Sequence, residues 1–282
     1  MVSSKPDLDR LVRIALEEDL GEDGADITTA AVVDSKLMGE AVLIARKPGV
    51  VSGANAAARV FELVSPPCDY HQLVADGARV NEGDQVARVT GPLASILTGE
   101  RTALNFLQRL SGIATATRRY ADALAAFPTV TLLDTRKTTP GLRFLERAAV
   151  RAGGGHNHRD GLWDAILIKD NHVAAAEGVT PAIERARRAR MAVEVEVDTL
   201  EQLQEALAAG AETVLLDNMS PELLRRSVEI TAGRARLEAS GGMTLEGAVE
   251  AAKAGVDRIS VGALTHSAPA LDISLEVIKT WR

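Results

Sequence analysis

Residues 193–218 read VEVEVDTLEQLQEALAAGAETVLLDN. Residues 193–197 and 213–217 are short runs rich in Val and Leu, which is typical of buried β-strands. Residues 199–209 between them have the apolar spacing of a helix, and Thr199 is a capping residue at its start. A strand, a helix and a second strand in this order predict neighbouring parallel strands, so the stretch places the chain in the α/β class.

The same alternation continues on both sides of this stretch. Further strands are expected at Val130–Asp134, Ala165–Lys169, Arg236–Ser240 and Arg258–Val261, and further helices near 141–152, 173–190, 220–231 and 244–254. Six βα units in about 135 residues are too few for a complete eight-unit barrel. We therefore expect an irregular, incomplete parallel α/β barrel. A doubly wound open sheet is the alternative, because periodicity alone does not separate the two.

The N-terminal part of the chain has a different sequence pattern. Residues 7–20 have helical spacing, and residues 40–90 contain short alternating runs interrupted by Pro and Gly turns. Those runs predict a small, mainly antiparallel layer. Residues 99–126 are rich in Ala and Leu at helical spacing and would connect this layer to the barrel.

Composition limits the classes of function. The chain has 282 residues, of which 46% are hydrophobic and 25% charged, and its net charge is −7. An acidic protein with 3% aromatic residues is a poor candidate for binding nucleic acid or an anionic membrane. One cysteine allows no internal disulfide, no apolar run approaches the roughly 18 residues of a membrane span, and the N-terminus is too charged for a signal peptide. A cytoplasmic location is expected.

Basic residues gather at the predicted strand ends and in one adjacent loop, where parallel α/β proteins place their chemistry. These residues are Arg136, Lys137, Arg159 and Lys169, with His158 as a further donor. Clustered charges are costly unless an anion neutralises them, and the guanidinium fork suits carboxylate or phosphate. The pattern predicts a pocket for an anion.

Other strand ends carry residues suited to a phosphorylated sugar. Glu196 and Asp217 are carboxylates in this basic setting and would hold ribose hydroxyls or a hydrated Mg²⁺. The small residues Ser240-Gly241-Gly242 and Gly262-Ala263 end the last two strands, a usual place for a phosphate site in barrels. Together the strand ends indicate an anion, a phosphorylated sugar and a metal ion.

Several residues have alternative interpretations. His156 and His158 have the spacing of a metal pair, although the glycine-rich loop and Arg159 favour anion binding. Lys169 would serve as a Schiff-base lysine in an aldolase. Glu194 and Glu196 would face solvent if their strand were at a sheet edge. Residues 76–84 are similar to the turn of a biotinyl or lipoyl carrier module but lack its modified lysine.

Eight segments of the sequence resemble the quinolinate phosphoribosyltransferase family, also called nicotinate-nucleotide pyrophosphorylase (carboxylating). They are GERTALNFL at 99–107, DTRKTTPGLR at 134–143, GGGHNHR at 153–159, IKDNH at 168–172, EVEVD at 194–198, LLDNM at 215–219, SGG at 240–242 and VGALTHS at 261–267. The likeness spans nearly the whole chain. It implies phosphoribosyl transfer from phosphoribosyl pyrophosphate to quinolinate with loss of CO₂, which gives nicotinate mononucleotide and pyrophosphate in NAD biosynthesis.

The resemblance also implies roles for residues. Quinolinate would be bound by Thr135, Arg136, His158, Arg159 and Lys169, with Arg101 from the neighbouring subunit of a homodimer or a larger assembly. Phosphoribosyl pyrophosphate and Mg²⁺ would be held by Lys137, Glu196, Asp217, Ser240, Gly241, Gly242, Gly262 and Ala263. Lys137, Lys169, Glu196 and Asp217 would be the catalytic residues.

The resemblance implies a domain division as well. An α/β sandwich domain would cover residues 1–112, the barrel would cover 113–268, and a tail at 269–282 would pack back on the first domain.

Overall fold

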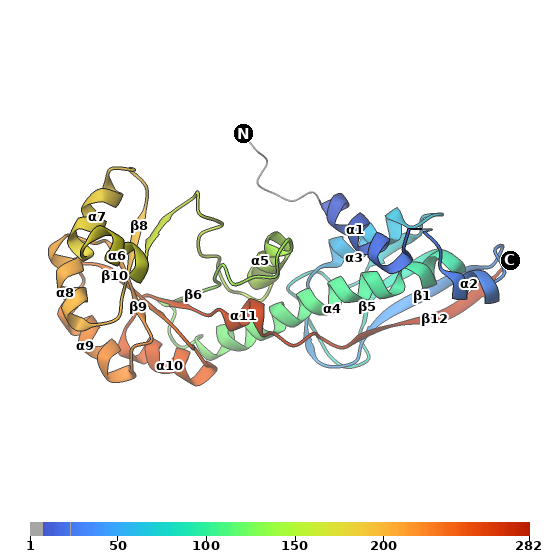
Figure 1. Ribbon diagram of the computed structural model, residues 1–282. Helices are drawn as coiled ribbons and strands as arrows, with labels where there is room; N and C mark the ends of the chain where they lie inside the picture. Colours follow the sequence, from blue (N-terminus) through green and yellow to red (C-terminus); the bar gives the residue numbers. More distant parts are fainter. Residues whose placement is uncertain (1–7, 23) are drawn as a thin grey trace. The chain divides into compact units, whose positions relative to one another are not determined.

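The computed structural model of the chain describes residues 8–22 and 24–282, and these form two compact units (Figure 1). The first, called here the N-terminal unit, combines the described residues up to Arg118 with Thr139–Gly154 and Ala268–Arg282. The second, called the barrel unit, combines Arg119–Thr138 and Gly155–Ser267. The chain therefore passes between the units more than once.

An antiparallel sheet forms the centre of the N-terminal unit. Its strand order is β12 (Ile273–Trp281), β1 (Met38–Ala45), β5 (Gln85–Pro92) and β3 (Asp69–Gln72). The short strands β2 (Gly49–Val50) and β4 (Arg79–Val80) form a separate antiparallel pair. The expected antiparallel layer is thus present, and the last strand of the chain pairs with β1.

Five helices of the described residues contribute to the N-terminal unit. They are α1 (Leu8–Leu20), α2 (Ile27–Val32), α3 (Ala54–Leu63), α4 (Leu93–Ala123, whose last residues belong to the barrel unit) and α5 (Arg143–Ala152). Apolar side chains of α1, α3 and α4 join those of the sheet in one buried core, which includes Phe61 and Leu107. The helix expected at 7–20 is confirmed from residue 8 on, whereas residue 7 lies outside the described residues. Sequence patterns missed α3, because its alanines carry little periodic signal.

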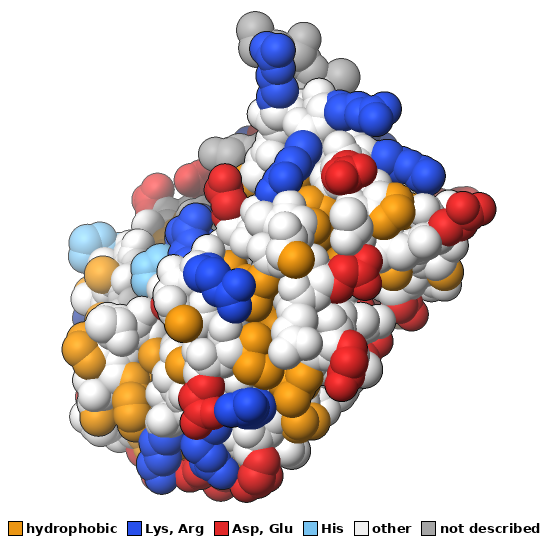
Figure 2. All heavy atoms as spheres, turned by 90° about the vertical axis from the view of Figure 1, so that its left-hand side faces the viewer, with side chains coloured by type: hydrophobic (Ala, Val, Ile, Leu, Met, Phe, Trp, Pro, Cys, Tyr) orange, Lys and Arg blue, Asp and Glu red, His pale blue; other side chains and the backbone are white. Residues whose placement is uncertain are grey.

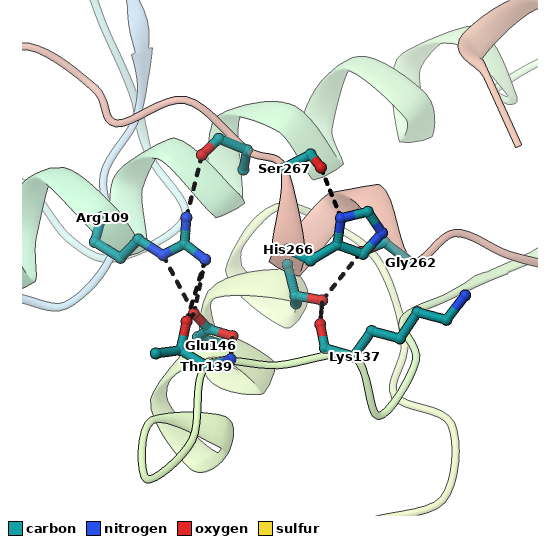
Figure 3. Close-up of polar contacts among 9 residues, drawn as sticks. Arg109, Lys137, Thr139, Glu146, Gly262, His266 and Ser267 are labelled. Atoms are coloured by element: carbon teal, nitrogen blue, oxygen red, sulfur yellow. Dashed lines mark hydrogen bonds and ion pairs between the residues drawn. The ribbon is translucent and has the colours of Figure 1, made fainter. Parts of the chain in front are cut away.

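A buried carboxylate joins three segments of the N-terminal unit. Glu146 on α5 is fully buried and accepts hydrogen bonds from Arg109 Nη2 at 2.9 Å and from Thr139 Oγ1 at 2.8 Å (Figure 3). Arg109 Nη1 also donates to the carbonyl oxygen of Ala268 at 3.2 Å. A buried charge needs such partners, and here they connect α4, α5 and the start of the C-terminal segment.

A six-stranded parallel sheet forms the barrel unit. Its order is β6 (Thr131–Leu133), β11 (Arg258–Ser260), β10 (Arg236–Ser240), β9 (Thr213–Asp217), β8 (Val193–Val197) and β7 (Ile166–Ile168). Strands β7 to β11 follow chain order without the reversal of a doubly wound sheet. The incomplete α/β barrel is therefore confirmed.

Helices follow the strands of the barrel unit. They are α6 (Asp170–Ala176), α7 (Val179–Arg187), α8 (Leu200–Ala208), α9 (Pro221–Thr231), α10 (Leu245–Ala254) and α11 (Ala263–His266). The single helix expected at 173–190 is wrong, because Glu177 and Gly178 have φ values of 67° and 143° and divide it in two. Thr199, Ser220 and Thr244 cap their helices through side-chain oxygens, as expected.

The surface carries both positive and negative side chains, as the composition predicts. On the face drawn in Figure 2, Lys and Arg side chains lie among Asp and Glu side chains. Among the described residues, none of the helices has the combined length and apolarity that crossing a membrane requires.

Candidate active site

A cavity of about 440 Å³ lies within the barrel unit. The C-terminal ends of the parallel strands and the loops that follow them supply most of its wall. Its lining residues are Thr135, Arg136, Lys137, His158, Arg159, Leu167, Lys169, Glu196, Leu215, Asp217, Asn218, Glu238, Ser240, Gly241, Gly242 and Ser260. The structure thus brings most of the site residues expected from the sequence to one place.

Five cationic or potentially cationic side chains line this cavity. Arg136 and Lys137 follow β6, His158 and Arg159 belong to the loop before β7, and Lys169 follows β7. The segments are distant in sequence but meet because their strands belong to one sheet. The cavity therefore has an electrostatic preference for anions.

The backbone of Lys137 is held in place while its side chain stays exposed. Its N–H donates to Thr135 Oγ1 at 3.1 Å, and its carbonyl accepts from Thr265 Oγ1 at 2.9 Å. A Cβ at Gly262 would lie 3.1 Å from both Lys137 Cδ and His266 Nε2. Figure 3 shows the Lys137 side chain extended, with its ammonium away from these backbone contacts.

Two carboxylates reach the cavity from the ends of β8 and β9. Glu196 Oε2 accepts a hydrogen bond from Lys169 Nζ at 2.6 Å. Asp217 Oδ2 accepts from Asn218 Nδ2 at 2.6 Å. These oxygens are the type of ligand that Mg²⁺ prefers, and Mg²⁺ commonly uses only one or two protein carboxylates.

The end of β10 approaches the end of β9 closely. Asn218 N–H donates to the Ser240 carbonyl at 2.9 Å. Gly241 has φ +93°, and a Cβ there would lie 2.2 Å from Asn218 Oδ1. Only glycine fits this position, and the neighbouring backbone is left accessible to the cavity.

Beneath the cavity, His158 contacts two buried carboxylates. Its Nε2 lies 2.9 Å from Glu194 Oε2 and 3.4 Å from Glu238 Oε1. Burial alone would lower the pKa of His158, but hydrogen bonds to Glu194 and Glu238 outweigh that effect and raise the pKa to about 10. Burial also raises the pKa of Glu194, an effect that the hydrogen bond from His158 opposes.

Arg159 lies next to this cluster. Burial and the positive charge of Arg136 lower the pKa of Arg159. Its Nη1 donates to the Ala165 carbonyl at 3.1 Å, which fixes the side chain along the loop before β7. Two like charges held this close indicate a site prepared for a negatively charged group.

Three expected site residues lie outside the cavity wall. Arg101 is an exposed residue of α4 in the N-terminal unit. Gly262 and Ala263 lie at the start of α11, where Gly262 adjoins the Lys137 side chain.

Sequence reasoning missed the buried partners of His158. It gave no role to Glu238 or Ser260, and it allowed Glu194 to face solvent from an edge strand. That alternative is wrong, because β8 lies between β7 and β9 and Glu194 is 7% exposed. The available signal was the two-residue periodicity that places Glu194 on the face of Glu196 and Glu238 on the face of Ser240.

His156, the other member of the metal pair considered from the sequence, is not part of the His158, Glu194 and Glu238 group. His156 is exposed, and its backbone forms a parallel bridge to Leu133. Of the residues that the structure describes, those near enough to His158 to share an ion with it are Glu194 and Glu238.

Family models match nearly the whole chain. Residues 26–111 match the quinolinate phosphoribosyl transferase N-terminal domain, and residues 113–276 match the C-terminal domain of the same family.

Individual relatives agree with these matches. A probable nicotinate-nucleotide pyrophosphorylase (carboxylating) of Bacillus subtilis is 42% identical over 96% of this chain and 93% of its own length. A chloroplastic nicotinate-nucleotide pyrophosphorylase (carboxylating) of Arabidopsis thaliana is 41% identical over 96% of this chain and 83% of its own. The solved structure of the nicotinate-nucleotide pyrophosphorylase from Francisella tularensis superposes with a TM-score of 0.90 at 41% identity, over 96% of this chain and 95% of that one.

Proposed function

This chain belongs to the quinolinate phosphoribosyltransferase family, and we propose that the cavity of its barrel unit is where quinolinate and phosphoribosyl pyrophosphate react. The chain is a pentosyltransferase that makes nicotinate mononucleotide in NAD biosynthesis. The observation that supports this location most strongly is that Arg136, Arg159 and Lys169 line one cavity.

In this proposal the two carboxylates of quinolinate lie among the cations of the cavity. Arg136 and Arg159 provide guanidinium forks that bind a carboxylate through paired hydrogen bonds. Lys169 and His158 add positive charge, and Thr135 adds a hydroxyl. A neutral ring with one carboxylate would leave part of this charge unpaired, which favours the dianion.

Phosphoribosyl pyrophosphate would occupy the side of the cavity formed by β8 to β10. Lys137 would bind its pyrophosphate, and Ser240, Gly241 and Gly242 would offer hydroxyl and backbone groups to phosphate. Gly262 and Ala263 would extend this phosphate site. Glu196 and Asp217 would hold Mg²⁺, directly or through water, and the ion would supply charge neutralisation for the departing pyrophosphate.

The protein would act mainly by positioning two mutually repelling anions. As pyrophosphate leaves, C1 of the ribose becomes oxocarbenium-like, and the pyridine nitrogen attacks from the opposite face. The glycosidic bond leaves the ring nitrogen cationic, so the bond to the adjacent carboxylate weakens and CO₂ departs. The electron pair left on that ring carbon then takes up a proton from water. Lys137, Lys169, Glu196 and Asp217 are the residues to which we assign this chemistry.

We further propose a homodimer with shared sites, in which Arg101 of each subunit reaches the cavity of the other. Its exposure on α4 is compatible with such a contact. The cytoplasmic location and the domain boundaries at residues 112 and 268 stay predictions.

The proposed metal role has a direct test. Pyrophosphate release by the purified protein should require quinolinate, phosphoribosyl pyrophosphate and Mg²⁺ together. Chelation should stop release and added Mg²⁺ should restore it. Full turnover in chelator would refute the assignment of Glu196 and Asp217 to a metal.

A further inference from the structure

The floor of the cavity contains negative charge that anion binding does not explain. Glu194 and Glu238 have side chains that are 9% and 0% exposed. Within the described part of the chain, no hydrogen-bond partner reaches Glu194 Oε1 or Glu238 Oε2. Buried carboxylates beneath a site for a dianion would weaken binding unless they serve a cation between them and the ligand.

His158 is in the position of such a cation. Its ring lines the cavity, while its Nε2 lies within hydrogen-bond distance of both carboxylates. Both neighbours of Nε2 are carboxyl oxygens, which accept hydrogen bonds when ionised, so this arrangement favours a proton on Nε2. The contacts of Nε2 with Glu194 and Glu238 therefore set the orientation of the ring.

The surrounding contacts fix the cluster on every side. Ser260 Oγ donates to Glu238 Oε1. Asp134, which is fully buried, accepts from the backbone N–H of His158 at 2.8 Å. Arg258 acts on Glu194 through its charge, and Arg159 is the cationic neighbour on the loop. Strands β8, β10 and β11 and the loop after β6 thus converge on one imidazole.

A shared metal ion fits these distances less well than a proton. Ligands of a tetrahedral zinc at bond lengths of about 2.1 Å would lie about 3.4 Å from each other. His158 Nε2 and Glu194 Oε2 are 2.9 Å apart, which is shorter than this separation and is the distance of a charged ion pair.

We propose that Glu194 and Glu238 are positioning residues that keep the His158 ring protonated and fixed at the floor of the quinolinate pocket. The proposal rests on the proposed binding of quinolinate in this cavity. One contact opposes it: Arg159 N–H lies 2.7 Å from His158 Nδ1, which suits a ring without a proton there. The attraction of two buried carboxylates for a protonated His158 ring is stronger than the one neutral hydrogen bond that favours an unprotonated Nδ1, because charge interactions are strong in a low-dielectric site.

The first test uses protein without substrates. In ¹⁵N-histidine-labelled wild-type protein at pH 8, both ring nitrogens of His158 should show the shifts of a protonated imidazole. In the double variant Glu194→Gln and Glu238→Gln, which keeps shape and hydrogen-bonding capacity, the ring should become neutral. A ring with unprotonated Nδ1 in the wild type, or a metal ion bound at the cluster, would overturn the proposal.

The second test measures whether Glu194 and Glu238 affect the binding of quinolinate. Between pH 6 and pH 8.5, the quinolinate KM of the double variant should rise about 10-fold or more relative to wild type, since His158 loses its charge only in the variant. The KM for phosphoribosyl pyrophosphate should have the same pH dependence in the double variant and in the wild type. In the surface control Glu229→Gln, both KM values should follow those of the wild type. An equal change of both KM values would indicate a merely structural role and reject the proposal. Absence of quinolinate turnover by the wild type would instead reject the proposed function.

Discussion

At the scale of single residues, Arg136 carries the clearest expectation. It lines the cavity together with Arg159, whose pKa its positive charge lowers, and a bound anion would offset the repulsion between the two guanidinium groups. Arg136→Ala should lower kcat/KM for quinolinate about 10- to 100-fold, the value of one or two charged hydrogen bonds. Steady-state kinetics check this, with the surface variant Arg226→Ala as the control. Unchanged kcat/KM in Arg136→Ala would remove this residue from the site.

The cations of the cavity could be predicted from sequence because they follow recognisable strands. Arg136, Lys137 and Lys169 end or follow strands whose apolar runs are clear, so their meeting follows from the parallel sheet. Glu194 and Glu238 could not be assigned in the same way. Their role depends on which strand face is turned inward and on the position of His158, and both are properties of the tertiary structure.

At the scale of elements, the close approach of β9 and β10 depends on a missing side chain. Gly241→Ala would place a methyl group 2.2 Å from Asn218 Oδ1 at a φ of +93°, whereas Gly242→Ala meets nothing within 4 Å. Gly241→Ala should therefore lower the free energy of unfolding by about 1–3 kcal/mol and raise the KM for phosphoribosyl pyrophosphate. Gly242→Ala should cost about 1 kcal/mol of stability. Urea unfolding measures the change in stability, and steady-state kinetics measure the change in KM. Equal effects of Gly241→Ala and Gly242→Ala would contradict the role of Gly241 in the close approach of β9 and β10.

Element boundaries were predictable where periodicity and capping agree. The expected strands at 193–197, 213–217 and 236–240 coincide with β8, β9 and β10, because each is a short segment with Val, Leu or Ala between turn or capping signals. The break at Gly178 was missed, because one glycine in a helical pattern does not reveal its φ.

At the scale of the whole molecule, the buried cluster makes stability depend on pH. His158 has a folded-state pKa of about 10 against 6.5 unfolded, so its contribution is complete below pH 6.5 and is lost as pH rises toward 10. The raised pKa of Glu194 acts in the same direction. The free energy of unfolding should fall by about 1.4 kcal/mol per pH unit between pH 7 and 9. Urea unfolding should show this slope in the wild type and a flatter one in Glu194→Gln with Glu238→Gln. Equal slopes would argue against a protonated His158.

The proposed homodimer also has a test at this scale. Arg101→Ala and Arg136→Ala should each be poorly active alone, because each damages every site. Mixed dimers of the two variants would contain one site with both arginines intact. When equal amounts of the two variants are mixed after mild dissociation, about half of the dimers are mixed and each has one intact site, so activity should rise to about one quarter of that of the wild type. Activity that stays at the level of the single variants, with mixed dimers demonstrated by mass spectrometry, would show that Arg101 acts within its own subunit.

Basic side chains from distant segments form one cavity, and we propose that this cavity binds quinolinate. The most direct measurement is a crystal structure of the protein with quinolinate bound. We expect the two carboxylates of quinolinate to contact Arg136, Arg159 and Lys169 in the cavity of the barrel unit. Quinolinate bound elsewhere, with these three side chains in contact only with solvent, would contradict it.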